Sequence, residues 1–314
     1  MAWPFSRLTT YVASTTPSIK AFDLNEMQDA IVALYGFPPI FGDGSDGAYA
    51  QAAGVIDLTS NKYYTTVSLT GTAHLRPVSH IIHANEYIRL RDTSEIGARG
   101  TTATAQPGGA PGGGANQTLG QGGAGGGGGT GGVNQPGSAG TSRTETSMGG
   151  SGGVGGSVAG GGGAGGAGGV ASLNEQLESR TIVALLTGML LGYNGTSYGS
   201  FPVQGGGGGG GGGQAGATDG GGGGGAGGPI ILCAPVIDIG AGCFVRTTGG
   251  DGGPETGGSG NGSGGGGGGG PIILICTQLI EDGTISAAGG VTGAGAVGGA
   301  SGVAGTIIRK ILFP

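Results

Sequence analysis

The sequence predicts a mainly β protein with an irregular glycine-rich body, preceded by a short N-terminal helix and a small all-β unit. Glycine makes up 87 of the 314 residues, against a usual share of about 7%. Only 7 glycines precede residue 100, and a short apolar motif recurs after glycine runs. These observations divide the chain into an arm, a helix, a β unit and a glycine-rich domain, at residues 1–20, 21–40, 41–100 and 101–314.

A short helix is predicted over residues 24–35, after the polar and extended arm. Asp23 can cap its N-terminus with Glu26 in a capping box, and Gly36 suits its C-terminal end. Its apolar residues are spaced three and four apart, as in a coiled-coil seam: Leu24, Met27, Ile31 and Leu34. A helix this short needs a partner. It therefore either packs on its own domain or associates with other copies, trimerising or attaching the protein.

The unit 41–100 consists of short β-branched or aromatic runs broken by turn residues. Residues 62–69, 80–84 and 87–91 are examples, and this spacing favours a small sandwich or a few rungs of a solenoid. The unit opens with a turn that contains Asp43 and Asp46. A calcium loop needs ligands at alternate positions and a closing glutamate, so this pattern favours a turn over a cation site.

An internal repeat indicates that the glycine-rich region folds. Glycine-rich chains are by default flexible linkers, because glycine loses more backbone freedom than other residues on ordering. Here, however, Pro-Ile-Ile-Leu follows a glycine run at Pro229 and again at Pro271, 42 residues later, and residues 306–313 resemble a third copy. Repetition at this period predicts stacked units. A flexible tether is the alternative.

Glycine tracts suit a backbone-paired bundle. Without a Cβ they favour an extended threefold helix, and neighbouring backbones can approach closely enough to satisfy every N–H and C=O. We therefore expect a polyglycine-II-like helical sandwich flanked by the Pro-Ile-Ile-Leu strands, with a further helix at about 173–187. The non-glycine interruptions predict loops at its tip, at residues 116–119, 133–148, 193–204, 214–219 and 254–263.

Composition and charge exclude several classes. The net charge is −6 with 12 lysines and arginines and no basic stripe, which argues against a nucleic-acid partner. No secretory signal pattern and no apolar run of membrane-spanning length are present. The three cysteines form no CxxC motif, so they predict buried small apolar residues of a protein folded in a reducing cytoplasm: Cys233, Cys243 and Cys276.

No residue pattern predicts an active site. The glycine runs contain GxGxxG many times, but any polyglycine does, and none is followed by the Lys-Ser/Thr of a P-loop. His74, His80 and His83 make a poor metal site, and no histidine follows them to serve a Ser–His nucleophile. We therefore expect no catalytic residue, no metal and no cofactor, and a binding or structural role.

Several motifs resemble those of glycine-rich tail and fibre proteins of tailed bacteriophages. The resemblance rests on residues 23–34, the turn at 41–48, Tyr63-Tyr64 and the alternation of polyglycine with Pro-Ile-Ile-Leu, and it covers most of residues 20–314. It implies a polyglycine-II-like sandwich whose tip loops bind receptors on the bacterial surface. The protein would be made in the host cytoplasm and incorporated in the virion, in its tail or fibre.

On this basis we expect a tail-fibre or fibre-tip adhesin, a homotrimer that joins other virion proteins and binds a bacterial surface glycan or outer-membrane protein. The candidate receptor-binding residues are three aromatics within nine residues, Tyr193, Tyr198 and Phe201, with Arg143 as a charged contact. These side chains alternatively pack the loop or a subunit interface. The other readings are a purely structural virion component (head fibre, decoration or baseplate protein) and, remotely, an ice-binding protein.

Overall fold

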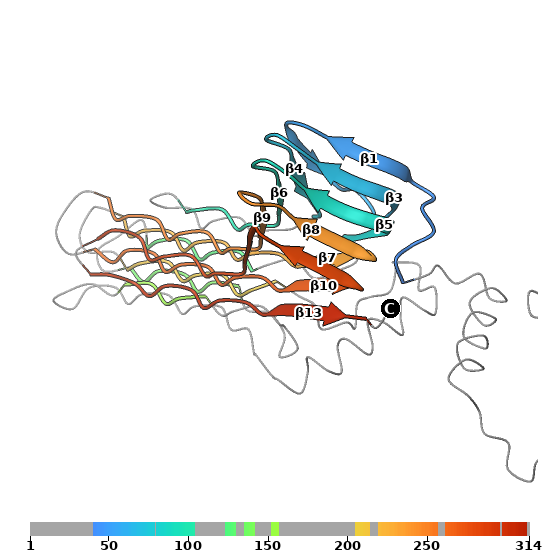
Figure 1. Ribbon diagram of the computed structural model, residues 1–314. Helices are drawn as coiled ribbons and strands as arrows, with labels where there is room; N and C mark the ends of the chain where they lie inside the picture. The colour runs from blue at the N-terminus through green and yellow to red at the C-terminus, as the bar shows by residue number, and fades with distance from the viewer. Residues whose placement is uncertain are drawn as a thin grey trace, which may run out of the picture.

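The computed structural model describes nine stretches of the chain, and all structural statements below refer to them. They are residues 40–78, 80–103, 123–129, 135–141, 152–156, 205–213, 219–256, 261–295 and 297–312. The described strands form two sheets that face each other, with a glycine-rich body extending away from them (Figure 1).

The larger sheet has eight strands, all paired in parallel. Its path is β1 (Gly47–Gln51), β3 (Lys62–Leu69), β5 (Ile81–Leu90), β7 (Ile230–Cys233), β10 (Ile272–Cys276) and β13 (Ile307–Ile311). Two further short strands of this sheet lie off this path. β8 (Val236–Ile239) pairs with β5, and β11 (Gln278–Glu281) pairs with β8.

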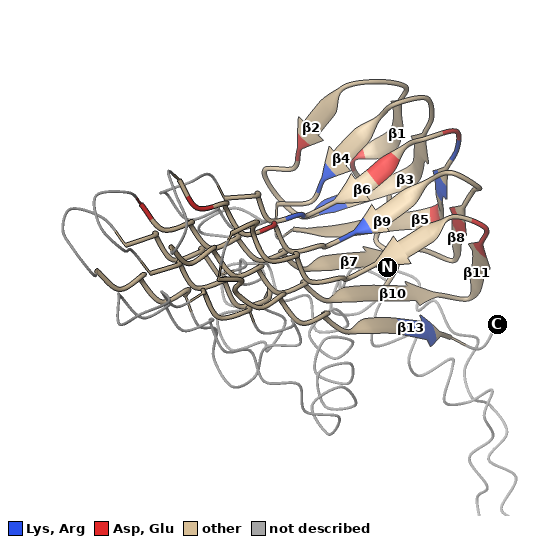
Figure 2. Cartoon of the chain, turned by 90° about the vertical axis from the view of Figure 1, so that its left-hand side faces the viewer, with Lys and Arg blue, Asp and Glu red and all other residues tan. Residues whose placement is uncertain are grey.

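The smaller sheet has five parallel strands, seen from the front in Figure 2. In spatial order they are β12 (Thr284–Ser286), β9 (Phe244–Arg246), β6 (Glu95–Gly97), β4 (His74–Arg76) and β2 (Val55–Asp57). The chain passes from a strand of the larger sheet to one of the smaller sheet in each rung, so the strands of successive rungs stack in parallel.

The corner that leads from the larger to the smaller sheet is a tight turn in several rungs. Gly71, Asp92 and Gly242 occupy it with φ values of 55°, 63° and 80°. This left-handed region is open to glycine and tolerated by aspartate. The Asp92 carboxylate also accepts a hydrogen bond from the Gly71 N–H at 2.7 Å, which ties one corner to the next.

The apolar core lies between the two sheets. Because side chains alternate across a strand, β4 turns Leu75 inward between the outward His74 and Arg76, and its burial pattern shows this. The inward residues stack from rung to rung into one buried cluster, which includes Leu69, Leu75, Ile88, Leu90, Ile96, Ile230, Leu232, Ile237, Val245, Ile272 and Leu274. Burying each such side chain contributes about 1.5–3 kcal/mol.

The other face of the larger sheet is apolar too. Ile231, Cys233, Ile273 and Ile275 are buried there in a second cluster, and the partly buried Phe41 packs on it. Strands buried on both faces read as continuous apolar runs, which explains the Pro-Ile-Ile-Leu segments. Cys233, Cys243 and Cys276 are free and buried, as predicted.

The alignment of the Pro-Ile-Ile-Leu repeat is confirmed by strand register. In the β7–β10 pair, Ile230 lies opposite Ile272 and Leu232 opposite Leu274, which is the 42-residue offset of the sequence repeat. The third copy also pairs, with Ile272 opposite Ile307. Each copy therefore supplies the same strand of a successive rung.

The glycine-rich body is built from excursions between rungs. The chain returns from the smaller to the larger sheet through four residues, 58–61, after β2 and 77–80 after β4. After β6, β9 and β12 the corresponding connections are residues 98–229, 247–271 and 287–306. Their described parts run out from the smaller sheet and back to the larger one, and together they form the extension in Figure 1.

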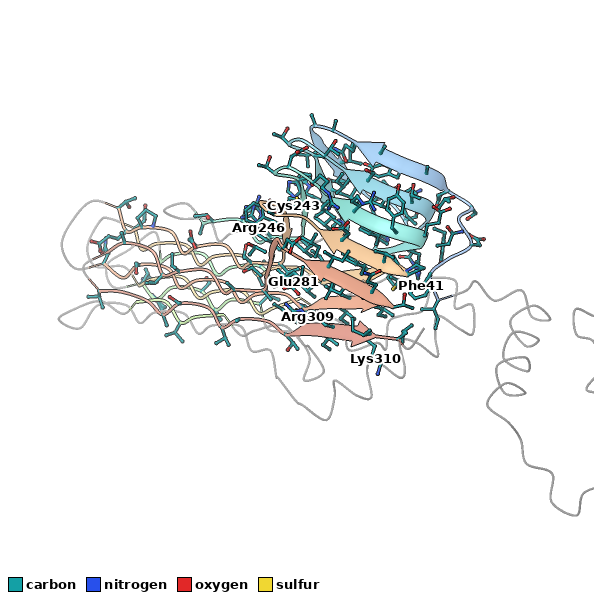
Figure 3. The ribbon with its side chains drawn as sticks, viewed as in Figure 1. Phe41, Cys243, Arg246, Glu281, Arg309 and Lys310 are labelled. Carbon is teal, nitrogen blue, oxygen red and sulfur yellow. The ribbon has the colours of Figure 1, made fainter. Side chains whose placement is uncertain are left out.

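Within this body, glycine tracts bond to one another through their backbones. In tract 205–213, N–H groups three residues apart reach the same neighbour: Gly206, Gly209 and Gly212 donate to the carbonyls of Gly227, Gly224 and Gly221. The N–H groups between them donate to two other tracts, at Thr141, Ser138, Gly153 and Gly156. Side chains crowd the sheets and are sparse here (Figure 3), so main-chain hydrogen bonds hold this region together.

The fold class predicted from the sequence is wrong. No described residue is helical, and the strands form two parallel sheets rather than flanks of a polyglycine-II-like helical sandwich. The predicted helices at 24–35 and 173–187 lie outside the described residues. The prediction failed because it treated residues 41–100 and the repeats separately, whereas β5 pairs with β7 and β8, and β6 with β9. Pairing across more than 130 residues leaves no local pattern.

Candidate functional site

The far end of the glycine-rich body is held by polar side chains that lie next to the glycine tracts in the sequence. Thr256 N–H donates to the Asp219 carbonyl at 3.1 Å, and Asp219 N–H donates to Thr256 Oγ1 at 3.2 Å. The Asn261 amide donates to the carbonyls of Thr256 at 3.1 Å and Asp219 at 3.4 Å. These three residues flank the connections 214–218 and 257–260, so both connections start from one fixed base.

Other segments end at the same place. The Gly129 N–H donates to the Gly212 carbonyl, and the Gly213 N–H donates to the Gly156 carbonyl. The Glu255 N–H donates to the Ala294 carbonyl. Gly262 N–H donates to Gly213 as well. The connection 130–134 therefore leaves the body beside the other two. We name this group of segment ends, with Asp219, Thr256 and Asn261, the tip cluster.

The predicted receptor-binding residues lie outside the described part of the chain. This holds for Tyr193, Tyr198, Phe201 and Arg143, and equally for the helix residues Leu24, Met27, Ile31 and Leu34; both assignments stay predictions. The described chain resumes after Phe201 at Gly205, at the sheet end of the body, because Gly206 bonds to Gly227, three residues before β7. The tip cluster is thus a different part of the body from that flank.

The sequence placed Asp219, Thr256 and Asn261 within two of its expected tip loops but did not single them out. The pattern that identifies them is simple: each bears an oxygen or amide next to a glycine tract. Such side chains bond readily to nearby backbone groups. They anchor the connections, whose sequences consist of glycine, alanine, valine, serine, threonine, asparagine and glutamine.

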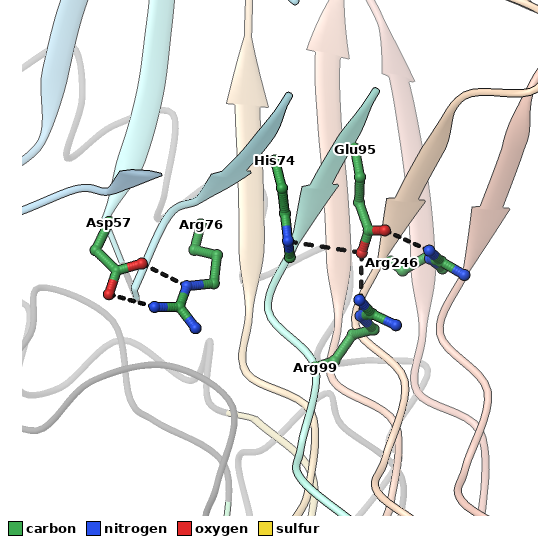
Figure 4. Close-up of polar contacts among 6 residues, drawn as sticks. All are labelled: Asp57, His74, Arg76, Glu95, Arg99 and Arg246. Carbon is green, nitrogen blue, oxygen red and sulfur yellow. Dashed lines mark hydrogen bonds and ion pairs between the residues drawn. The ribbon is translucent and has the colours of Figure 1, made fainter. Parts of the chain in front are cut away.

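A second polar group lies on the outward face of the smaller sheet, where the glycine excursions begin. The Glu95 carboxylate is 7% exposed. It contacts Arg99 Nε at 3.1 Å, His74 Nε2 at 3.6 Å and Arg246 Nη2. Beside it, Arg76 donates two hydrogen bonds to Asp57 (Figure 4). This group links β2, β4, β6 and β9 to the first residues of the body.

The electrostatics of this group follow from burial and pairing. Burial lowers the pKa of His74 and outweighs the opposite effect of the Glu95 charge, while nearby arginines lower it further. The hydrogen bonds from Arg76 to Asp57 raise the pKa of that guanidinium. His74 is therefore neutral at pH 7, and the arginines carry the positive charge.

A comparable cluster on the larger sheet sets two arginines against one carboxylate. Arg91 donates Nη1 and Nη2 to Asp238, and Arg89 adds Nε at 3.3 Å. The hydrogen bond from Arg91 is the main cause that lowers the pKa of Asp238. Arg91 Nη1 also reaches the Leu90 carbonyl at 2.7 Å, so this cluster commits its donors internally.

The described residues contain no group of three or more His, Cys, Asp or Glu side chains suited to a metal ion. Asp43 accepts the Ser45 N–H at 2.9 Å and Asp46 accepts the Tyr63 N–H at 2.7 Å, as expected of turn residues. Nor does the described part of the chain contain a helix with the length and hydropathy to cross a bilayer.

The three histidines have different neighbours. His83 Nδ1 donates to the Ile40 carbonyl at 3.0 Å, and its ring stacks on Tyr63 with centroids 4.7 Å apart. Burial lowers the pKa of His83 to about 4. His80 is also buried, and burial lowers its pKa. The His83 ring therefore packs against the neighbouring rung, because Tyr63 lies opposite it on β3.

Comparison with known proteins reveals no relationship. The chain matches no family model, no curated protein and no solved structure. Its function is therefore inferred from the geometry of the described residues.

Proposed function

We propose that this protein is a bacteriophage virion protein, a tail-fibre or fibre-tip adhesin that displays short loops at the tip cluster. The observation that supports the proposal is the convergence of segment ends at Gly129, Gly213, Asp219, Thr256 and Asn261. Binding residues are often found on loops positioned by a rigid scaffold, and here the scaffold is the backbone-bonded glycine body.

The proposal extends to assembly. The helix predicted from the sequence at 24–35 would trimerise the protein or attach it to other tail or fibre proteins, and several weak loops would then act together on a bacterial surface glycan or outer-membrane protein. Linked weak sites gain affinity through effective concentration. The net charge of −6 disfavours nucleic acid as a partner.

A purely structural virion role is the second candidate. It is favoured by apolar side chains exposed on outer tracts of the body, Val154, Val291 and Val303, which are 53%, 58% and 47% exposed. Apolar side chains left exposed in this way are available for contact with neighbouring subunits. Such a protein would bind neighbours in the particle without binding a host receptor.

The test replaces residues 130–134 and 214–218 by Gly-Ser sequences of equal length and measures adsorption of the purified protein to host cells. We expect adsorption to be lost while the melting temperature is unchanged, because the anchors Asp219, Thr256 and Asn261 are retained. The matched variant Tyr193/Tyr198/Phe201→Ala keeps the tip and tests the aromatic loop. If the wild-type protein does not adsorb to host cells, the adhesin proposal is contradicted and the structural role remains.

A further inference from the structure

Three arginines gather on the outward face of the smaller sheet, and their charge exceeds what the neighbouring carboxylates need. Arg76 comes from β4, Arg246 from β9, and Arg99 follows β6. In Figure 2 this face is turned toward the viewer, with no described element in front of it. We propose that Arg76, Arg99 and Arg246, here named the arginine row, bind an oxyanion, a phosphate or carboxylate group of an extended ligand.

The charge balance supports this. Glu95 is surrounded by Arg99, Arg246 and His74, although one cation would neutralise it. Asp57 offsets Arg76, so three arginines face two carboxylates. The chain as a whole has a net charge of −6, and the fold collects these arginines from residues up to 170 positions apart in the sequence.

The arginine row also keeps hydrogen-bond donors uncommitted. A guanidinium has five N–H donors. In the described contacts Arg246 reaches Glu95 with Nη2 and Arg99 reaches it with Nε, which leaves both terminal nitrogens of the 44% exposed Arg99 without a partner among the described residues. Arg91, by contrast, commits both terminal nitrogens to Asp238. Guanidinium groups with donors to spare suit the paired oxygens of phosphate and carboxylate.

The row is fixed in place and accessible. The buried Glu95 holds two of its members, and the Phe244 ring lies 4.1 Å from the Arg246 guanidinium. Gly97 leaves the space for these side chains, since a Cβ there would lie 2.5 Å from Glu95 Oε1 and 2.7 Å from His74 Nε2. Arg76 and Arg99 are 49% and 44% exposed. Side chains held in advance lose less freedom on binding.

This inference rests on the arginine row alone. The proposed function adds only a source for the anion, the bacterial surface. On a bacterial surface, phosphate and carboxylate groups are carried by acidic or phosphorylated glycans. Binding of the anion and adsorption to cells are separate measurements, so either proposal can fail without the other.

The test is a titration of the full chain with inorganic phosphate and with free glucuronate, followed by calorimetry or by amide chemical shifts. We expect saturable binding to the wild type, weakened about tenfold by Arg76→Gln or Arg99→Gln, since each removes a charge-assisted hydrogen bond. The control is Arg309→Gln, because Arg309 is also exposed and pairs with Glu281 through two hydrogen bonds. It removes the same charge and should bind as the wild type does.

The source of the anion is then distinguished with lipopolysaccharide, intact and enzymatically dephosphorylated. Binding that requires the phosphate groups identifies a glycan-borne ligand, whereas binding of free phosphate alone identifies a small anion; both support the row. An absence of saturable binding by the wild type at millimolar anion overturns the proposal. Equal weakening by Arg309→Gln overturns it too, because that result indicates only overall charge.

Discussion

At the scale of single residues, the glycine body depends on positions where no side chain fits. A Cβ on Gly209 would lie 2.2 Å from the Gly265 carbonyl oxygen, which belongs to the backbone of a neighbouring tract. That neighbour is itself hydrogen-bonded and has little room to shift. Glycine is therefore required here by the approach of another backbone and not by its own φ.

We predict that Gly209→Ala destabilises the protein by about 1–3 kcal/mol or more, the usual cost of overpacking. Thermal unfolding of the purified variant measures it. The matched control is Gly298→Ala, where a Cβ would meet nothing within 4 Å and the effect should stay within about 0.5 kcal/mol. Equal melting temperatures for the two variants would show that the tracts are not closely packed.

The buried histidine of β5 gives a prediction for acid. His83 has a folded-state pKa of about 4 and an unfolded value near 6.5. Between these pH values the unfolded chain binds the extra proton, so stability falls as the pH is lowered from about 6.5 and the loss is complete near pH 4. Its size is on the order of 3 kcal/mol.

Denaturant unfolding of the wild type and His83→Gln at pH 7, 5.5 and 4 measures this loss. The variant should lose less stability across that range, although it starts from a lower value at pH 7 because it gives up the stacking on Tyr63. Parallel losses in both proteins would assign the acid sensitivity to other groups. His74 and His80, whose pKa values are also lowered by burial, are the first to consider.

At the scale of elements, the short strands β4 and β9 of the smaller sheet each bury a single side chain. β4 has three residues, and only Leu75 among them is fully buried. We predict that Leu75→Ala costs about 2–5 kcal/mol, measured by denaturant unfolding. Val55→Ala on the edge strand β2, where the side chain is 56% exposed, is the control and should change stability little.

Element positions were easier to predict than their pairing. The run 62–69 is β3 residue for residue, because alternating branched and aromatic residues mark a half-buried strand. Residues 80–84 and 87–91 were expected as two strands, whereas β5 runs unbroken from Ile81 to Leu90. Asn85 and Glu86, which suggested a break, are exposed residues within that strand.

The candidate site was predictable only in outline. Glycine tracts that end at polar residues indicated tip loops, and Asp219, Thr256 and Asn261 lie within those ranges. No sequence pattern indicates the arginine row, because Arg76, Arg99 and Arg246 come together only when β4, β6 and β9 pair. Parallel stacking brings together residues that no local spacing relates.

At the scale of the whole molecule, the stack and the glycine body are one continuous structure. Residues 98–103 leave β6 and bond to residues 246–251, which leave β9; the Gly249 N–H in turn bonds to Ala288 after β12. The hydrogen-bond ladder of the smaller sheet thus continues into the body. The apolar core holds the sheets, and backbone hydrogen bonds of about 1 kcal/mol each hold the extension.

Amide hydrogen exchange of the full chain tests this most directly. If the tracts are fixed by their main-chain bonds, the amides of residues 205–213, 219–228 and 261–270 exchange slowly, with protection approaching that of β5 and β10. Exchange of those glycine amides at the rate of an unstructured peptide, while the strands stay protected, would contradict the account and reduce the body to a flexible tether.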